Sequence, residues 1–235
     1  MIYASIQSKR GAFFNVGYRL DSNNFGSMGL WGGIGLAALL AITGSIVLDI
    51  VGYVLPEMPE SLQRALDSMT KGNFWVDFLC VSIFAPFFEE WFCRGEVLRG
   101  LLNYKRKNGN GIKPVWAIVV SAAFFSLIHG NLWQAIPAFG IGCLMGYVYY
   151  KTGSLKLTMV MHFVNNTFAL VLSQIDGLKE TDYFIDAMGP GWYWLAFSAS
   201  AILIFLIIRK FSDFYIYPKL AIAKALTYDK KIIIC

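Results

Sequence analysis

The chain has 235 residues, of which 57% are hydrophobic and only 15% are charged, and its formal net charge is +5. A soluble globular domain carries about 25% charged residues, so this composition excludes an ordinary soluble protein. The apolar residues arrive in long blocks, and blocks of roughly 20 match the hydrocarbon thickness of a bilayer. We therefore predict an integral membrane protein in which residues 1–235 form a single transmembrane domain.

Six apolar segments are predicted to be membrane-spanning helices. In chain order they cover 28–55, 74–102, 115–129, 132–150, 154–175 and 192–208. Between the first two, residues 57–72 place apolar side chains at helical spacing, which predicts a short helix on the surface. The predicted fold class is an all-α, polytopic transmembrane helical bundle of about six spans with short amphipathic surface helices.

Lysine and arginine are distributed unevenly over the predicted loops. They are in excess before the first span, after the second, after the fourth and after the sixth, whereas the other loops are neutral or acidic. Cytoplasmic loops carry the excess of Lys and Arg. We therefore predict a multi-pass protein of the cell membrane, surrounded by the lipid bilayer, with both termini cytoplasmic. Because topology explains the basic balance, no nucleic-acid partner is predicted.

Several spans contain side chains that are costly in a membrane and therefore mark function by default. They are Glu89, Glu90 and Arg94 in the second span, His129 in the third, and His162 and Asn166 in the fifth. The two histidines are the only ones in the chain, and both lie within predicted spans. Helix rise places these groups at depths that allow, but do not require, a shared site between the midplane and the cytoplasmic side.

The spacing in the second span separates the two carboxylates. Glu90 and Arg94 are four residues apart, which places them on one helix face in the favourable order for an ion pair. Glu89 points about 100 degrees away from Glu90. We expect Arg94 to give structural support to Glu90 while Glu89 faces a cavity.

Three short motifs follow one another on three predicted membrane helices. They read Glu89-Glu90-Trp91-Phe92-Cys93-Arg94, Phe125-Ser126-Leu127-Ile128-His129 and His162-Phe163-Val164-Asn165-Asn166. Together they resemble the CAAX-protease and bacteriocin-processing family, also called CPBP or Abi, which includes the Ras-converting CAAX endoprotease. The resemblance covers a catalytic core at about 74–173 in this sequence. It implies a hydrolase, an intramembrane endopeptidase that cleaves a peptide or protein substrate, membrane-associated substrates included, in a cavity open to the cytoplasmic side.

The resemblance implies a catalytic site made of Glu89, Glu90, His129, His162 and Asn166. Two mechanisms stay open. In the first, Glu89 with His129 activates water, and His162 with Asn166 stabilises the oxyanion. In the second, Glu89, His129 and His162 are ligands of a zinc ion, as in a metalloprotease. The chain has no His-Glu-x-x-His motif, and Asn166 suits an oxyanion donor better than a zinc ligand, which favours the metal-free, glutamate-type mechanism.

Two other classes of function compete with the peptidase. A non-catalytic immunity or partner-binding membrane protein on the same fold is the main alternative, and the presence of every motif residue disfavours it. A proton-coupled transporter also uses intramembrane Glu and His, but no inverted repeat is visible in the sequence. The eukaryotic CAAX enzymes have additional spans, so a prenylated substrate does not follow from the resemblance.

Overall fold

The computed structural model describes residues 18–25, 28–70, 72–104, 111–175 and 183–214, and helices make up the regular structure in this part of the chain. Four helices are long and apolar enough to cross a membrane, namely α2 (Gly29–Val54), α8 (Leu132–Thr152), α9 (Leu155–Leu172) and α11 (Pro190–Ser212). They confirm four of the predicted spans and make the protein a multi-pass membrane protein.

The predicted span 115–129 corresponds to α7 (Pro114–Leu127), which is apolar but shorter than the other four helices. It begins at Pro114, whose missing N–H costs nothing in the first turn of a helix. It ends two residues earlier than predicted, because residues 128 and 129 form a turn. His129 therefore lies just beyond the helix rather than within it.

The predicted span 74–102 is one continuous helical run made of five segments. They are α4 (Phe74–Asp77), η2 (Phe78–Phe84), α5 (Ala85–Glu90), η3 (Trp91–Leu98) and α6 (Arg99–Asn103), where η2 and η3 are π-helical. Asn73 starts the run, since its side-chain oxygen accepts hydrogen bonds from the N–H groups of Trp75 and Val76. π-Helical turns are frequent at functional sites, and here they flank the segment that carries Glu89 and Glu90.

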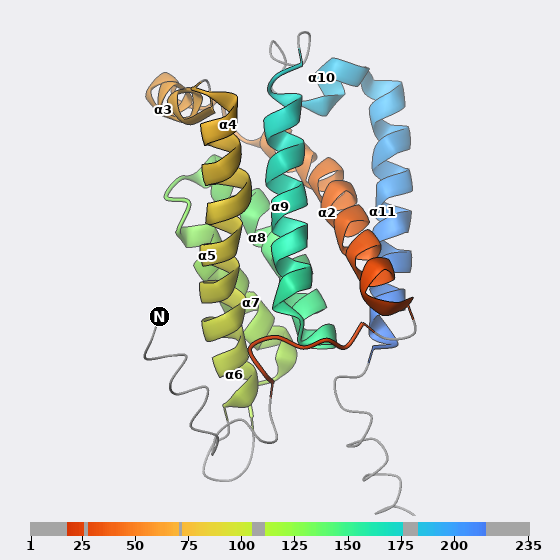
Figure 1. Ribbon diagram of the computed structural model, residues 1–235. Coiled ribbons are helices and arrows are strands. Elements are labelled where there is room, and N and C mark those ends of the chain that lie inside the picture. Colours follow the sequence, from red (N-terminus) through yellow and green to blue (C-terminus); the bar gives the residue numbers. More distant parts are fainter. Residues whose placement is uncertain (1–17, 26–27, 71, 105–110, 176–182, 215–235) are drawn as a thin grey trace, which may run out of the picture.

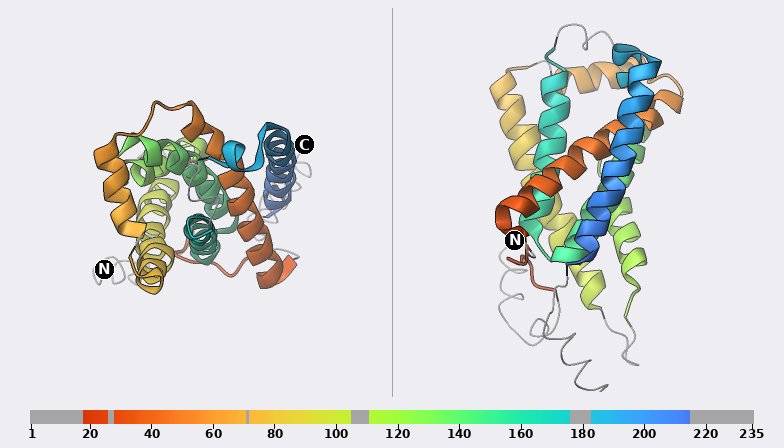
Figure 2. Two further views of the ribbon diagram at one scale, coloured as in Figure 1. Left: turned by 90° about the horizontal axis from the view of Figure 1, so that it is seen from above. Right: turned by 90° about the vertical axis from the view of Figure 1, so that its right-hand side faces the viewer.

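Successive long helices run in opposite directions in one bundle (Figures 1 and 2). α9 lies between the 74–103 helix and α2 and contacts both. α7 and α8 pack against each other, and α11 packs on the outside of α2. The main core is therefore formed where α2, α8 and α9 meet, and it includes the buried side chains of Leu40, Met145, Leu157 and Met161.

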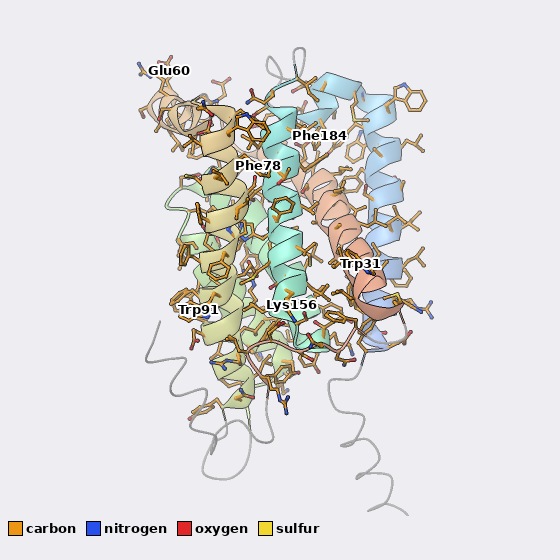
Figure 3. All side chains as sticks on the ribbon, viewed as in Figure 1. Trp31, Glu60, Phe78, Trp91, Lys156 and Phe184 are labelled. Atoms are coloured by element: carbon orange, nitrogen blue, oxygen red, sulfur yellow. The ribbon has the colours of Figure 1, made fainter. Side chains whose placement is uncertain are left out.

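The two ends of the bundle carry different charges. Figure 3 shows Lys156 near one end and Glu60 at the other. The basic side chains at the first end are Arg99, Lys151, Lys156, Arg209 and Lys210, at helix ends that meet there. The opposite end holds α3 (Glu60–Thr70) and α10 (Phe184–Met188). α3 is the predicted surface helix of residues 57–72, shortened because it begins only after Pro59.

Residues 18–25 tie α9 to the 74–103 helix at the basic end. The Asp21 carboxylate accepts a hydrogen bond of 2.9 Å from the Leu155 N–H and so caps the first turn of α9. Asn103, at the end of the 74–103 helix, exchanges two hydrogen bonds with the backbone of Tyr18. These contacts fix the start of α9, the helix that carries His162, relative to the helix that carries the two glutamates.

Candidate active site

The centre of the site is a buried ion pair between Glu90 and Arg94. Their side chains are fully buried, and Arg94 Nη1 lies 2.7 Å from Glu90 Oε1. The predicted i, i+4 pairing on one helix face is therefore present. The guanidinium also donates a hydrogen bond of 3.0 Å to the carbonyl of Gly142 on α8, and it lies over the ring of Phe125 at 4.5 Å from the centroid. Arg94 thus joins three helices around the carboxylate.

Gly142 allows this close approach of α8. A Cβ atom at this position would lie 3.1 Å from the Phe125 ring and 3.3 Å from both Ala122 Cβ and Arg94 Nη2. The lack of a side chain therefore brings the α8 backbone within hydrogen-bonding distance of Arg94. Small residues of this kind let membrane helices pack closely.

His162 on α9 binds the same carboxylate. Its Nδ1 lies 3.1 Å from Glu90 Oε1, and the imidazole is 3% exposed. Because a carboxylate accepts hydrogen bonds, we assign the proton to Nδ1, which then donates to Glu90. In the neutral imidazole this leaves the Nε2 lone pair free. A carboxylate that fixes the tautomer of a histidine in this way is a recurrent feature of catalytic sites.

Glu89 lies on the other side of the same imidazole. Its Oε2 is 3.9 Å from His162 Nε2 and makes no hydrogen bond within the described protein, and the side chain is 29% exposed. The sequence predicted that Glu89 would lie off the Arg94 face, and the structure shows no ion pair between Glu89 and Arg94 among the described residues. Both carboxylates thus flank the His162 imidazole, but Arg94 pairs only with Glu90 among the described residues, as the helical spacing suggested.

His129 is joined to this group through Phe125. Its ring centroid is 5.1 Å from that of Phe125, and the His162 centroid is 5.2 Å from Phe125 on an edge-to-face contact. His129 Nδ1 lies 2.8 Å from the Phe125 carbonyl and donates to it, because a carbonyl only accepts. Among the described residues, no hydrogen bond or ion pair joins His129 to Glu89. The imidazole next to Glu89 is that of His162.

Asn166 lies one turn beyond His162 on α9, and its carboxamide faces the 74–103 helix. Its Nδ2 donates a hydrogen bond of 2.8 Å to the carbonyl of Val81 in η2. The structure thus brings Glu89, Glu90, Arg94 and His162 into direct contact, with Asn166 adjacent along α9 and His129 across Phe125.

The proposed zinc ligands do not form a metal site in this arrangement. Within the described ranges, no group of three or more His, Cys, Asp or Glu side chains is placed to hold a metal ion. His162 Nδ1 binds Glu90 and His129 Nδ1 binds a backbone carbonyl, and because metal-bound histidines commonly have such a partner on the other ring nitrogen, these contacts leave Nε2 of each histidine able to bind a metal. As the side chains stand, however, Glu89, His129 and His162 are not gathered around one point.

A buried cluster of carboxylates and imidazole on a multi-pass helical bundle is consistent with the catalytic site of an intramembrane hydrolase. The family model for type II CAAX prenyl endopeptidases, Rce1-like, matches residues 71–168. This stretch is thus a domain of the Rce1-like CAAX endopeptidase family, a family of hydrolases, and the resemblance noted in the sequence is confirmed. No curated protein and no solved structure shows significant similarity to the chain.

Some residues that shape the site were not predicted from the sequence. Gly142 and Phe125 contact Arg94, and Val81 accepts from Asn166. Phe125 is the first residue of the quoted Phe-x-x-x-His motif, but no role was predicted for it. Gly142 carries a sequence signal, because Gly142 and Gly146 form a small-xxx-small pair of the kind that brings membrane helices together. Val81 carries none, since its contribution is a backbone carbonyl.

Proposed function

We propose that this protein is an intramembrane endopeptidase that hydrolyses a peptide bond with water held between Glu89 and His162. The observation that carries the proposal is the geometry of three side chains. Glu90 binds His162 Nδ1 at 3.1 Å, and His162 Nε2 lies 3.9 Å from Glu89 Oε2. A separation of that size between two acceptors suits one water molecule that gives a hydrogen to each.

In the proposed step, Glu89 is the general base. The water oxygen forms a bond to the scissile carbonyl carbon while a water proton moves to the Glu89 carboxylate. The tetrahedral intermediate carries its negative charge on the former carbonyl oxygen, where Asn166 donates a hydrogen bond. The carbon–nitrogen bond then breaks, and Glu89 returns the proton to the leaving nitrogen. Two products form, and together they contain the atoms of the substrate and one water.

Glu90, Arg94 and His129 have supporting positions in this proposal. Glu90 fixes the orientation and tautomer of His162, and Arg94 balances the Glu90 charge in the membrane interior. The imidazole of His129 packs against Phe125, which separates it from the imidazole of His162. The geometry favours His162 over His129 as the partner of Glu89 on the water, which reassigns the roles that the sequence analysis gave to the two histidines.

The proposed topology has six crossings, with both termini cytoplasmic. The 74–103 helix and α7 add two crossings to the four long apolar helices. The basic side chains gather at one end of the bundle, and cytoplasmic segments carry the excess of Lys and Arg. The site lies within the bundle, so a substrate enters from the bilayer or from the basic, cytoplasmic end. A membrane-associated protein could reach the site by the first route, and a peptide from the cytoplasm by the second.

The direct test is cleavage by the purified protein in lipid vesicles. The probes are a CAAX-type peptide with a prenylated cysteine, the same peptide without the lipid and an unrelated hydrophobic peptide. Mass spectrometry of the wild-type reaction should show paired fragments whose masses sum to that of one probe plus one water. Glu89→Gln should abolish the fragments.

The matched control is Glu96→Gln, which changes a glutamate on the same helix that pairs with Arg99 at 3.4 Å, near the basic end. This variant should keep cleavage close to that of the wild type. Absence of fragments from all three probes, or equal cleavage by Glu89→Gln and the wild type, would argue against the proposal.

A further inference from the structure

A proline within the 74–103 helix leaves one backbone carbonyl without its helical donor. In η2 the hydrogen bonds join residues five apart, as between the Ala85 N–H and the Cys80 carbonyl. The next donor in that series would be residue 86, which is Pro86 and has no N–H. The carbonyl of Val81 would be its partner, and it accepts instead from the side chain of Asn166 at 2.8 Å. Asn166 thus satisfies a carbonyl that the proline leaves unpaired.

Two further side chains extend this contact across the bundle. Asn165 Nδ2 donates to Asn166 Oδ1 at 3.1 Å. Ser45 on α2 lies with its Oγ 2.8 Å from Asn165 Oδ1 and 2.9 Å from the carbonyl of Ala41. A hydrogen-bonded chain therefore runs from α2, through two adjacent residues of α9, to η2.

The Val81 carbonyl fixes the direction of every bond in this chain. Because a carbonyl only accepts, Nδ2 of Asn166 must face it, and Oδ1 of Asn166 must then face Asn165. Asn165 must present Nδ2 in turn, which leaves its Oδ1 toward Ser45, and the single hydroxyl hydrogen of Ser45 is then donated to Asn165 rather than to the Ala41 carbonyl. A reversed amide at either asparagine would place two acceptors against each other. The carboxamide of Asn166 is therefore held at both of its ends.

One N–H of this fixed carboxamide is left for another partner. Nδ2 carries two hydrogens, and Val81 is its one acceptor among the described residues. The same residue lies one helical turn from His162. A donor that is aimed before the reaction begins is what oxyanion stabilisation requires, because no reorganisation is then needed during the reaction.

We propose that Ser45 and Asn165 are positioning residues, which aim the free N–H of Asn166 at the oxyanion of the reaction. The inference rests on the proposed peptidase function and adds to it a contribution from α2. Ser45 lies outside residues 71–168, the stretch that matches the family model. The matched domain therefore depends on a helix that precedes it for the orientation of one of its polar groups.

The test is a set of double-mutant cycles on cleavage in vesicles. Ser45→Ala and Asn165→Ala are each measured in the wild type and in the Asn166→Ala variant. Each change should lower kcat by about five- to tenfold, the size of one neutral hydrogen bond, with KM nearly unchanged. Neither change should lower kcat further once Asn166 is alanine, because the group that they orient is then absent.

Two controls separate positioning from packing. Ser45→Thr keeps the hydroxyl and should restore most of the activity lost in Ser45→Ala. Thr43→Val removes a buried hydroxyl of α2 whose acceptors, among the described residues, are carbonyls of its own helix, those of Leu39 and Leu40. It should leave kcat unchanged. Thermal unfolding of each variant shows whether it folds. If Asn165→Ala does not fold, the milder variant Ser45→Ala is sufficient for the test.

The outcomes distinguish this inference from the proposed function. If the enzyme is active but the kcat losses of Ser45→Ala and Asn165→Ala multiply with the loss of Asn166→Ala, the positioning inference is wrong. The proposed peptidase function would be unaffected by that result. A kcat in Ser45→Ala equal to that of the wild type would lead to the same conclusion. A wild-type protein that cleaves none of the probes would overturn both.

Discussion

The buried ion pair at the centre of the site gives the strongest stability prediction. Arg94→Met replaces the guanidinium by an apolar side chain and leaves Glu90 buried with His162 as its remaining partner. Both side chains of the pair are fully buried and 2.7 Å apart. Removing one partner of a buried pair costs about 3 to 5 kcal/mol, because the other charge is left uncompensated. The lost hydrogen bond to Gly142 adds to this cost.

The double variant Glu90→Gln, Arg94→Met tests the reasoning behind that magnitude. It removes both charges, and replacement of a whole buried pair is often close to neutral. We therefore expect the double variant to be more stable than Arg94→Met alone. The assay is reversible unfolding in mixed micelles, followed by circular dichroism. A loss below about 1 kcal/mol in Arg94→Met, the range of an exposed pair, would refute the burial argument, and so would a double variant less stable than the single one.

Three further predictions address mechanism, packing and topology. Asn166→Ala should lower turnover by about 100- to 1,000-fold, as for loss of one oxyanion donor, while chelators change the wild-type rate little; inactivation by chelators with recovery on added zinc would contradict this. Gly142→Ala should lower stability by about 1 to 3 kcal/mol, since the new methyl would lie 3.1–3.3 Å from three side chains; unchanged unfolding would show that α8 can shift. Reporter fusions at residue 108 and after residue 210 should read cytoplasmic and one at residue 182 external, and a reversal at any of them would reject the topology.

The local parts of this site could be predicted from the sequence. Glu90 and Arg94 pair because helical geometry places residues four apart on one face, and that rule needs no knowledge of the other helices. The long apolar helices followed in the same way from hydropathy. The end of α7 before His129 could not be predicted from hydropathy, because the turn at residues 128 and 129 lies within an apolar stretch.

The contacts between helices could not be predicted in this way. That Glu89 lies beside His162 rather than His129 depends on how α9 packs against the 74–103 helix. The link between Ser45 and Asn165 depends on the packing of α2 on α9. Pro86 was visible in the sequence, but its effect on the Val81 carbonyl follows only once the π-helical pairing of η2 is known.

The central claim is that Glu89 and His162 act on one water as a unit, and a double-mutant cycle between them tests it most directly. The measurement is kcat/KM for peptide cleavage by the wild type, Glu89→Gln, His162→Ala and the double variant. Groups that act as a unit give strongly non-additive losses. Each single variant should therefore lose nearly all activity, and the double variant should be hardly worse than either. Independent, multiplying losses, or a single variant close to the wild type, would contradict the claim.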